Sequence, residues 1–149
     1  MPERRIQTIL VPTDFSEGAA CALDWARTLA QAFHAAIVVL HVLELPVTWT
    51  PLGGLGSLPT PLSTESVDQL ASEAQTILET VGGDAPEVTR RLLRKGHPRE
   101  VILAAVQEVA ADAVVMGTHG RRGVSHLLIG SVAEHVVQQS PVPVWTVRE

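Results

Sequence analysis

The sequence lacks the features of a disulfide-stapled or membrane-spanning protein. Cys21 is the only cysteine among 149 residues, which excludes an internal disulfide and a thiolate zinc site and predicts a reducing, cytoplasmic setting. The N-terminus has no signal-peptide stretch, and no apolar run approaches the roughly 18 residues that cross a bilayer. Eleven basic against 16 acidic residues give a net charge of −5. This charge argues against nucleic acid and membrane partners but not against a small anionic ligand.

The remaining composition is that of one compact domain. Apolar residues make up 46% of the chain and charged residues 18%. A chain of this length buries roughly 68 to 70% of its unfolded surface, enough for a core without staples. We therefore expect a single domain over residues 1–149.

Short apolar segments alternate with segments of helical period. Strands are expected at residues 6–11, 36–43, 88–93, 113–116 and 142–147. Helices are expected at residues 16–33, 67–81, 98–110 and 131–139, with Ser16 as an N-cap, Pro98 in a first turn and Gly82-Gly83 as a stop. This order predicts a doubly wound α/β fold with a mostly parallel five-stranded sheet, in which the polar 88–93 strand suits an edge.

Residues 45–63 interrupt the alternation between the second strand and the second helix. This segment holds four prolines and several glycines and shows neither helical nor strand period. We therefore interpret it as an inserted loop, either a lid or a simple insertion.

A glycine-rich segment after the fourth strand has the composition of an anion cradle. Gly117 and Gly120 allow close backbone approach and positive φ, so that exposed N–H groups could surround phosphate oxygens. Gly130-Ser131 then opens a helix whose free N–H groups favour a second phosphate. Neither GxxxxGK[ST] nor GxGxxG between a strand and a helix is present, and Gly54-Leu55-Gly56 has no helix start behind it.

The spacing of these glycines resembles the nucleotide-binding signature of the universal stress protein family. Gly117 is followed after two residues by Gly120, and after nine more by Gly130 and Ser131. Four further blocks match that family in order, at residues 9–16, 40–42, 96–98 and 140–144. The resemblance implies a Rossmann-like sheet of order 3-2-1-4-5 with helices on both faces. Asp14 and Gly117 would then face one cleft at the switch point between strands one and four.

The resemblance also implies an adenine-nucleotide site that takes ATP, with Mg²⁺ held mainly through its phosphates. Asp14 resembles the family's ribose-binding acid, because a carboxylate accepts hydrogen bonds from both ribose hydroxyls. The adenosine side would be formed by Pro12, Thr13, Val42 and Met116. The phosphate channel would be lined by Gly117, His119, Gly120, Arg121, Gly130, Ser131 and Val132. The alternative is that Asp14 and the glycines only shape turns, and that His119 and Arg121 are ordinary loop residues.

The sequence nominates no catalytic residue and no protein-bound metal. The six histidines show no HxH or HExxH spacing, and no GxSxG elbow is present. The leading hypothesis is an ATP-binding protein with a regulatory role in stress response. A slow ATP hydrolase or phosphotransferase using the same pocket, and a nucleotide-independent interaction module, stay open as alternatives.

The last predicted strand, 142–147, is apolar and would leave a sheet edge open. An exposed apolar edge favours aggregation unless it is paired or covered. The resemblance implies a homodimer in which the two final strands pair about a two-fold axis. The alternative is a short edge protected by Pro141 and Pro143.

Overall fold

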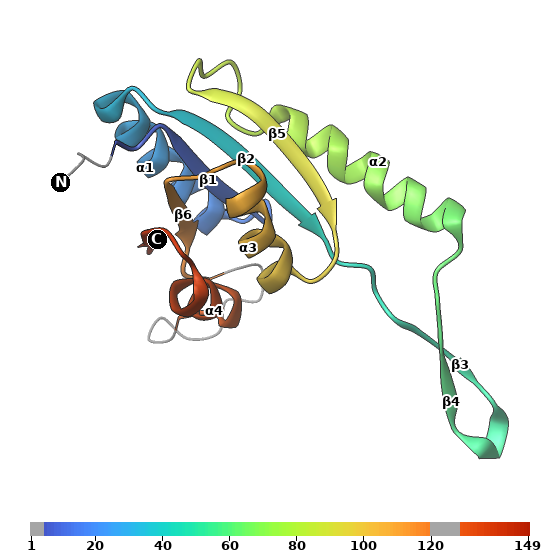
Figure 1. Cartoon of the computed structure of the whole chain (residues 1–149). Coiled ribbons are helices and arrows are strands. Elements are labelled where there is room, and N and C mark those ends of the chain that lie inside the picture. Colours follow the sequence, from blue (N-terminus) through green and yellow to red (C-terminus); the bar gives the residue numbers. More distant parts are fainter. Residues whose placement is uncertain (1–4, 120–128) are drawn as a thin grey trace.

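The computed structural model, which describes residues 5–119 and 129–149, is built on a parallel sheet of five strands (Figure 1). The strands of this sheet are β1 (Thr8–Thr13), β2 (Ala36–Leu43), β5 (Val88–Lys95), β6 (Ala113–Gly117) and β7 (Val144–Val147). Their spatial order is β5-β2-β1-β6-β7, and each pairing within the sheet is parallel. With β3 and β4 set aside, this is the predicted order 3-2-1-4-5, so the doubly wound α/β fold is confirmed and the polar β5 does lie at an edge.

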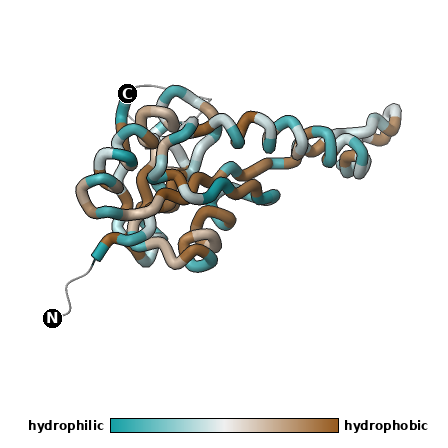
Figure 2. The backbone as a smooth tube through the Cα atoms, turned by 90° about the horizontal axis from the view of Figure 1, so that it is seen from above, coloured by the Kyte–Doolittle hydropathy of each residue, from teal (hydrophilic) through white to brown (hydrophobic). Residues whose placement is uncertain are grey.

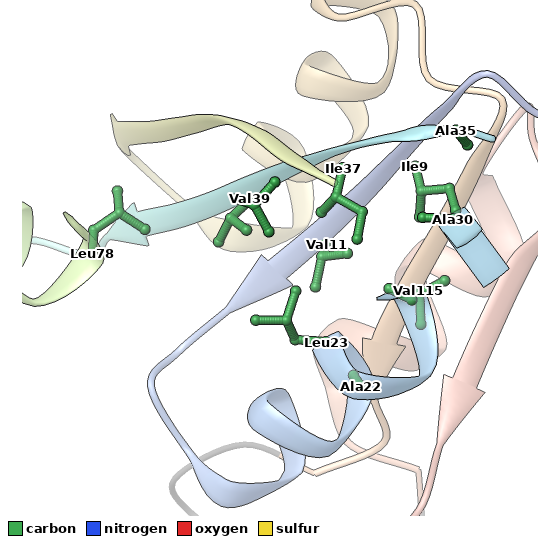
Figure 3. Close-up of a cluster of buried hydrophobic side chains, with 12 residues drawn as sticks. Ile9, Val11, Ala22, Leu23, Ala30, Ala35, Ile37, Val39, Leu78 and Val115 are labelled. Atoms are coloured by element: carbon green, nitrogen blue, oxygen red, sulfur yellow. The ribbon is translucent and has the colours of Figure 1, made fainter. Parts of the chain in front are cut away.

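Helices cover both faces of the sheet. They are α1 (Glu17–Phe33), α2 (Thr64–Thr80), α3 (Pro98–Glu108) and α4 (Ser131–Gln139). On one face, Leu23 of α1 and Leu78 of α2 pack over Val11 and Val39 (Figure 3). The opposite face, under α3 and α4, has its own cluster around Leu10. Neighbouring residues of β1 thus enter opposite cores, because successive side chains of a strand point to opposite faces.

Helix boundaries follow the predicted capping residues. Ser16 is the N-cap of α1, and its Oγ accepts a hydrogen bond from the N–H of Ala19 at 3.2 Å. Pro98 occupies the first turn of α3. After α2, Gly82 turns the chain with a φ of +78°, which a residue with a side chain adopts only with strain.

Strand β1 extends beyond its predicted end, through Pro12 to Thr13. The pairing of β1 with β6 covers only Ile9 and Leu10, so the missing N–H of Pro12 costs no ladder bond to that strand. Pairing with β2 continues to Thr13, which lies beside His41. This extension carries the residues of interest to the carboxyl edge of the sheet.

Residues 45–63 are not simply a loop, which corrects the prediction from their composition. They contain an antiparallel hairpin, β3 (Thr48–Pro51) and β4 (Ser57–Thr60), joined by a 3₁₀ turn and projecting away from the sheet (Figures 1 and 2). The hydroxyl of Thr48 donates to the carbonyl of Thr60, and the hydroxyls of Thr50 and Thr60 bond each other. Because neither face of the hairpin is buried, its strands need no apolar alternation and left no strand period to detect.

Two large apolar side chains that helical period would turn inward are exposed. Phe33, in the last turn of α1, is 49% exposed, and Ile77 of α2 is 47% exposed. The buried residues of α2 are Ala74 and Leu78, so this helix is attached by a narrow stripe. None of the helices described is long and apolar enough to cross a membrane.

Candidate functional site

The β1–α1 loop holds Asp14 in a fixed local geometry. Asp14 Oδ1 accepts a hydrogen bond from the N–H of Ser16 at 3.0 Å, and Thr13 Oγ1 accepts one from the N–H of Phe15 at 3.1 Å. Phe15 itself adopts a φ of +65°, which costs a residue with a side chain roughly 1–2 kcal/mol. The turn expected as an alternative role for Asp14 is therefore present, and it fixes the direction of this carboxylate at the end of β1.

His41 supports this loop, a role that the sequence analysis missed. It lies near the end of β2, 9% exposed, with Nδ1 2.8 Å from the carbonyl oxygen of Thr13. Its ring stacks on Phe15, with ring centroids 4.1 Å apart and an interplanar angle of 23°. A histidine within an otherwise apolar strand was the available sequence signal, since a buried imidazole requires a hydrogen-bond partner.

The two apolar residues predicted to face adenine, Val42 of β2 and Met116 of β6, lie on the α3/α4 side of the sheet, where both belong to or pack against one hydrophobic cluster. Val132 of α4, predicted to line the phosphate channel, packs against the same cluster. Pro12, the residue before Thr13, is buried in β1. The structure thus brings predicted apolar residues from distant parts of the sequence into one wall.

Gly117 and Gly130 are required by close approach of backbone to backbone. The N–H of Gly130 donates to the carbonyl of Thr118 at 2.6 Å, and a Cβ on Gly130 would lie 2.8 Å from that same oxygen. A Cβ on Gly117 would lie 3.0 Å from the carbonyl carbon and oxygen of Gly18 in α1. Neither glycine has a positive φ, so the conformational freedom expected at Gly117 is not what that position uses.

The contact between Gly130 and Thr118 places the start of α4 at the end of β6. The N-cap of α4 is Gly130, and no side chain of the described residues caps this end of the helix. Its first turn therefore offers backbone N–H groups and the positive end of the helix dipole to an anion. Ser131, exposed at the first helical position, adds a hydroxyl there.

His119 follows Thr118 just beyond the end of β6. Its Nδ1 lies 2.9 Å from the hydroxyl of Thr118, whereas its Nε2 is buried without a hydrogen-bond partner among residues 5–119 and 129–149. The predicted phosphate residues Gly120 and Arg121 lie outside the described residues. A buried ring nitrogen of this kind is a position at which a polar ligand group would gain a bond.

A groove of about 350 Å³ lies on the other face of the sheet, between α1 and α2. Its floor includes Val11 and Val39, and its wall includes Thr13, Phe15 and Ser16. The β1–α1 loop therefore borders this groove, whereas Val42 packs on the opposite face of the sheet, under α3 and α4. Across the part of the chain that the structure describes, no three His, Cys, Asp or Glu residues gather closely enough to hold a metal ion.

These features define a doubly wound α/β domain whose candidate ligand site lies at the carboxyl ends of β1 and β6. The chain order β1-α1-β2 proceeds to one side of the sheet, and β6 and β7 lie on the other side of β1. Crossovers diverge at this switch point, which is where sheets of this class bind ligands.

The chain belongs to the universal stress protein family, whose family model matches residues 5–148. It is 34% identical to a universal stress protein of Thermus aquaticus, over 95% of this chain and 98% of the relative. It is 33% identical to universal stress protein YxiE of Bacillus subtilis, over 94% and 97%.

Solved structures agree with this fold. The structure of MJ0577, from Methanocaldococcus jannaschii, aligns with a TM-score of 0.78 at 24% identity and covers 98% of each chain. UspA from Lactobacillus plantarum aligns with a TM-score of 0.75 at 26% identity, over 98% of this chain and 100% of that one.

Proposed function

We propose that this chain is a cytoplasmic ATP-binding regulator of stress response. The observation that carries the proposal is the placement of the N-terminus of α4 against the end of β6, beside the strand that leads to Asp14. Within residues 5–119 and 129–149, no side chain caps this helix end. Backbone N–H groups favour phosphate, and a carboxylate accepts the hydroxyl protons of ribose. The apolar surface around Val42 and Met116 would contact the adenine base.

Two relatives support the adenine part of the proposal. A universal stress protein was solved in complex with cAMP, and it aligns with a TM-score of 0.61 at 24% identity. A universal stress protein from Archaeoglobus fulgidus was solved with dAMP, and it aligns with a TM-score of 0.57 at 23% identity. Both ligands contain adenine and phosphate, which match the two kinds of surface that meet here.

In the proposed complex, Asp14 binds ribose, and Pro12, Thr13, Val42 and Met116 contact the adenosine. The phosphate residues are Gly117, His119, Gly120, Arg121, Gly130, Ser131 and Val132. His119 fits this role because the phosphate would satisfy its buried Nε2. Mg²⁺, held through the phosphates, would reduce their charge.

Calorimetric titration of the purified chain with Mg-ATP tests the proposal. We expect saturable binding with one nucleotide per chain, and mass spectrometry of the supernatant after denaturation should reveal a retained adenine nucleotide. No heat at millimolar ATP, together with no retained nucleotide, would refute nucleotide binding. ATP turnover well above a buffer blank, lost in Asp14→Ala, would instead favour a slow hydrolase or phosphotransferase.

We also propose a homodimer through the C-terminal strand, residues 142–147. β7 is the last strand of the sheet order, and Trp145 on it is 37% exposed. An open strand edge with an apolar side chain is stabilised by pairing with an identical edge. Sedimentation velocity of the native chain and of Val144→Lys tests this contact, because a charge at the edge should lower the mass of the native assembly. An unchanged mass in the variant would contradict it.

A further inference from the structure

The β3–β4 hairpin concentrates exposed apolar side chains on an arm that projects from the sheet (Figures 1 and 2). Twelve large apolar side chains are exposed in the parts of the chain that the structure describes, and six of them lie within residues 45–58. Leu55, in the turn, is 88% exposed, and Trp49 on β3 is 62% exposed. Clustered apolar exposure of this kind marks a contact with another protein or with a membrane.

Proline interrupts both outer edges of the hairpin. The N–H of Leu52 donates to the carbonyl of Gly56 next to the turn, and bonded and non-bonded pairs alternate along an antiparallel ribbon. The next pair contains Pro51 and is therefore non-bonded, as is the pair of Trp49 with Pro59. Backbone groups of non-bonded pairs point outward, so Pro51 removes a donor from the edge of β3 and Pro59 removes one from the edge of β4. Neither edge offers a continuous ladder, which argues against cover by a strand of another chain.

The two faces of the hairpin differ in polarity. Successive side chains of a strand alternate between faces, so Thr48, Thr50 and Thr60 share one face. There the hydroxyl of Thr48 donates to the carbonyl of Thr60, and the hydroxyls of Thr50 and Thr60 bond each other. Trp49 and both strand prolines share the other face, whereas Leu58 is the apolar member of the threonine face. The hairpin is thus an amphipathic ribbon that ends in an apolar turn.

The charge pattern favours an apolar partner without net charge. Residues 45–64 contain no Asp, Glu, Lys, Arg or His, and the charged residues that flank them are Glu44 and Glu65. A partner recognised through ion pairs requires charges on the arm. The acidic flanks and the net charge of −5 disfavour an anionic lipid surface. A bilayer of phosphatidylcholine, which is zwitterionic, meets both conditions.

We propose that the hairpin is an interfacial anchor that holds the chain on the surface of an electrically neutral lipid bilayer. Leu55 and the turn enter the boundary between headgroups and acyl chains, and Trp49 lies at headgroup level, where tryptophan is favoured. The hydroxyl bonds on the threonine face and the missing donors of both strand prolines reduce the number of polar groups that lose water on insertion. The contact is peripheral, and it is apolar rather than electrostatic, so the acidic net charge does not oppose it.

Flotation of the full chain with phosphatidylcholine vesicles tests the anchor. We expect the native chain to float with these vesicles, and to float less with mixed phosphatidylcholine–phosphatidylglycerol vesicles at low salt. Leu55→Asp should lower the partition coefficient about tenfold or more, because a charge replaces an apolar group at the tip. Phe33→Asp is the matched control: Phe33 is 49% exposed but lies in the last turn of α1, outside the hairpin, so this variant should float like the native chain.

Tryptophan fluorescence reports whether the hairpin itself enters lipid. The chain has three tryptophans, so a Trp25→Phe/Trp145→Phe double variant leaves Trp49 as the only reporter. Its emission should shift to the blue with phosphatidylcholine vesicles and be quenched by brominated acyl chains. Leu55→Asp in this background should reduce both effects, and Trp49→Phe in the native background should abolish the shift.

Sedimentation velocity without lipid separates this proposal from a protein contact. Native chain and Leu55→Asp should have the same mass, because the anchor meets lipid and not a second copy. A lower mass in Leu55→Asp would assign the hairpin to a protein interface and overturn the proposal. No flotation of the native chain, flotation that requires phosphatidylglycerol, an equal loss in Phe33→Asp, or an unshifted Trp49 emission would also overturn it.

Discussion

Replacement of Asp14 separates ligand binding from the turn that this residue forms. In the native chain the N–H of Ser16 donates to Asp14 Oδ1 at 3.0 Å. Asp14→Asn keeps an oxygen that can accept this hydrogen bond, but it removes the negative charge. A hydrogen bond to a charged acceptor contributes about 1 kcal/mol more than one to a neutral acceptor. For two ribose hydroxyls the loss is about 2 kcal/mol, or roughly 30-fold weaker ATP binding.

Asp14→Ala completes the comparison, because it removes both the charge and the turn. We expect ATP binding to weaken by roughly 100-fold or more, and the free energy of unfolding to fall by about 1.5–3 kcal/mol as the Ser16 N–H loses its charged acceptor. Asp14→Asn keeps a neutral acceptor and should lose only about 1 kcal/mol. Calorimetry gives the affinities and urea denaturation the stabilities.

A deoxyribose nucleotide identifies the contact. The native chain should prefer ATP to 2′-deoxy-ATP, and this preference should shrink in Asp14→Asn, because one of the hydroxyls bound by the carboxylate is absent from the deoxy compound. The reasoning is refuted if Asp14→Asn binds ATP as the native chain does. It is also refuted if the preference for ATP is the same in both proteins.

Three further predictions concern the support of the site and the fold. His41→Phe should lower the free energy of unfolding by about 1–3 kcal/mol, measured in urea, because the carbonyl of Thr13 loses its partner; native stability would contradict this. Leu78→Ala should cost about 2–5 kcal/mol because Leu78 is fully buried, whereas the exposed neighbour Ile77→Ala serves as the control and should change little. A hydrogen bond from Gln31 lowers the pKa of Glu87 below its usual value of 4.5. The stability that Glu87 adds is therefore present above pH 4.5 and lost as the pH falls through the lower folded-state pKa, so the difference between native and Glu87→Gln in a pH series of urea unfolding should shrink toward acid; a difference independent of pH would contradict it.

Local chemistry made the sheet and its helices predictable. Ser16, Pro98 and Gly82 occupy the caps, first turn and stop that their types favour, because these preferences depend on nearby backbone groups. The continuous apolar run of β2 likewise required cover on both faces. Such features depend on a few neighbouring residues, and they were sufficient to predict the order of the helices and of the strands of the main sheet.

The hairpin and the support by His41 depend on partners distant in sequence. Thr48 and Thr60 bond across twelve positions, and His41 reaches Thr13 across 28. No period marks these contacts, since their partners become adjacent only after folding. Gly120 and Arg121 were predicted from motif spacing alone, and that prediction stays open because they lie outside the described residues.

Backbone packing explains why positions 117 and 130 hold glycine, and this explanation does not require a bound nucleotide. Gly130 must be small because the carbonyl of Thr118 occupies the space of a side chain, and Gly117 because α1 passes at Gly18. The first approach places the N-cap of α4 beside Thr118 at the end of β6, and the second places β6 against α1. Gly117 and Gly130 therefore have a packing role whether or not an anion binds. In the proposed complex the Asp14 carboxylate contacts the ribose, so a change of its charge tests the proposed function more directly than replacement of either glycine, which would also disturb this packing.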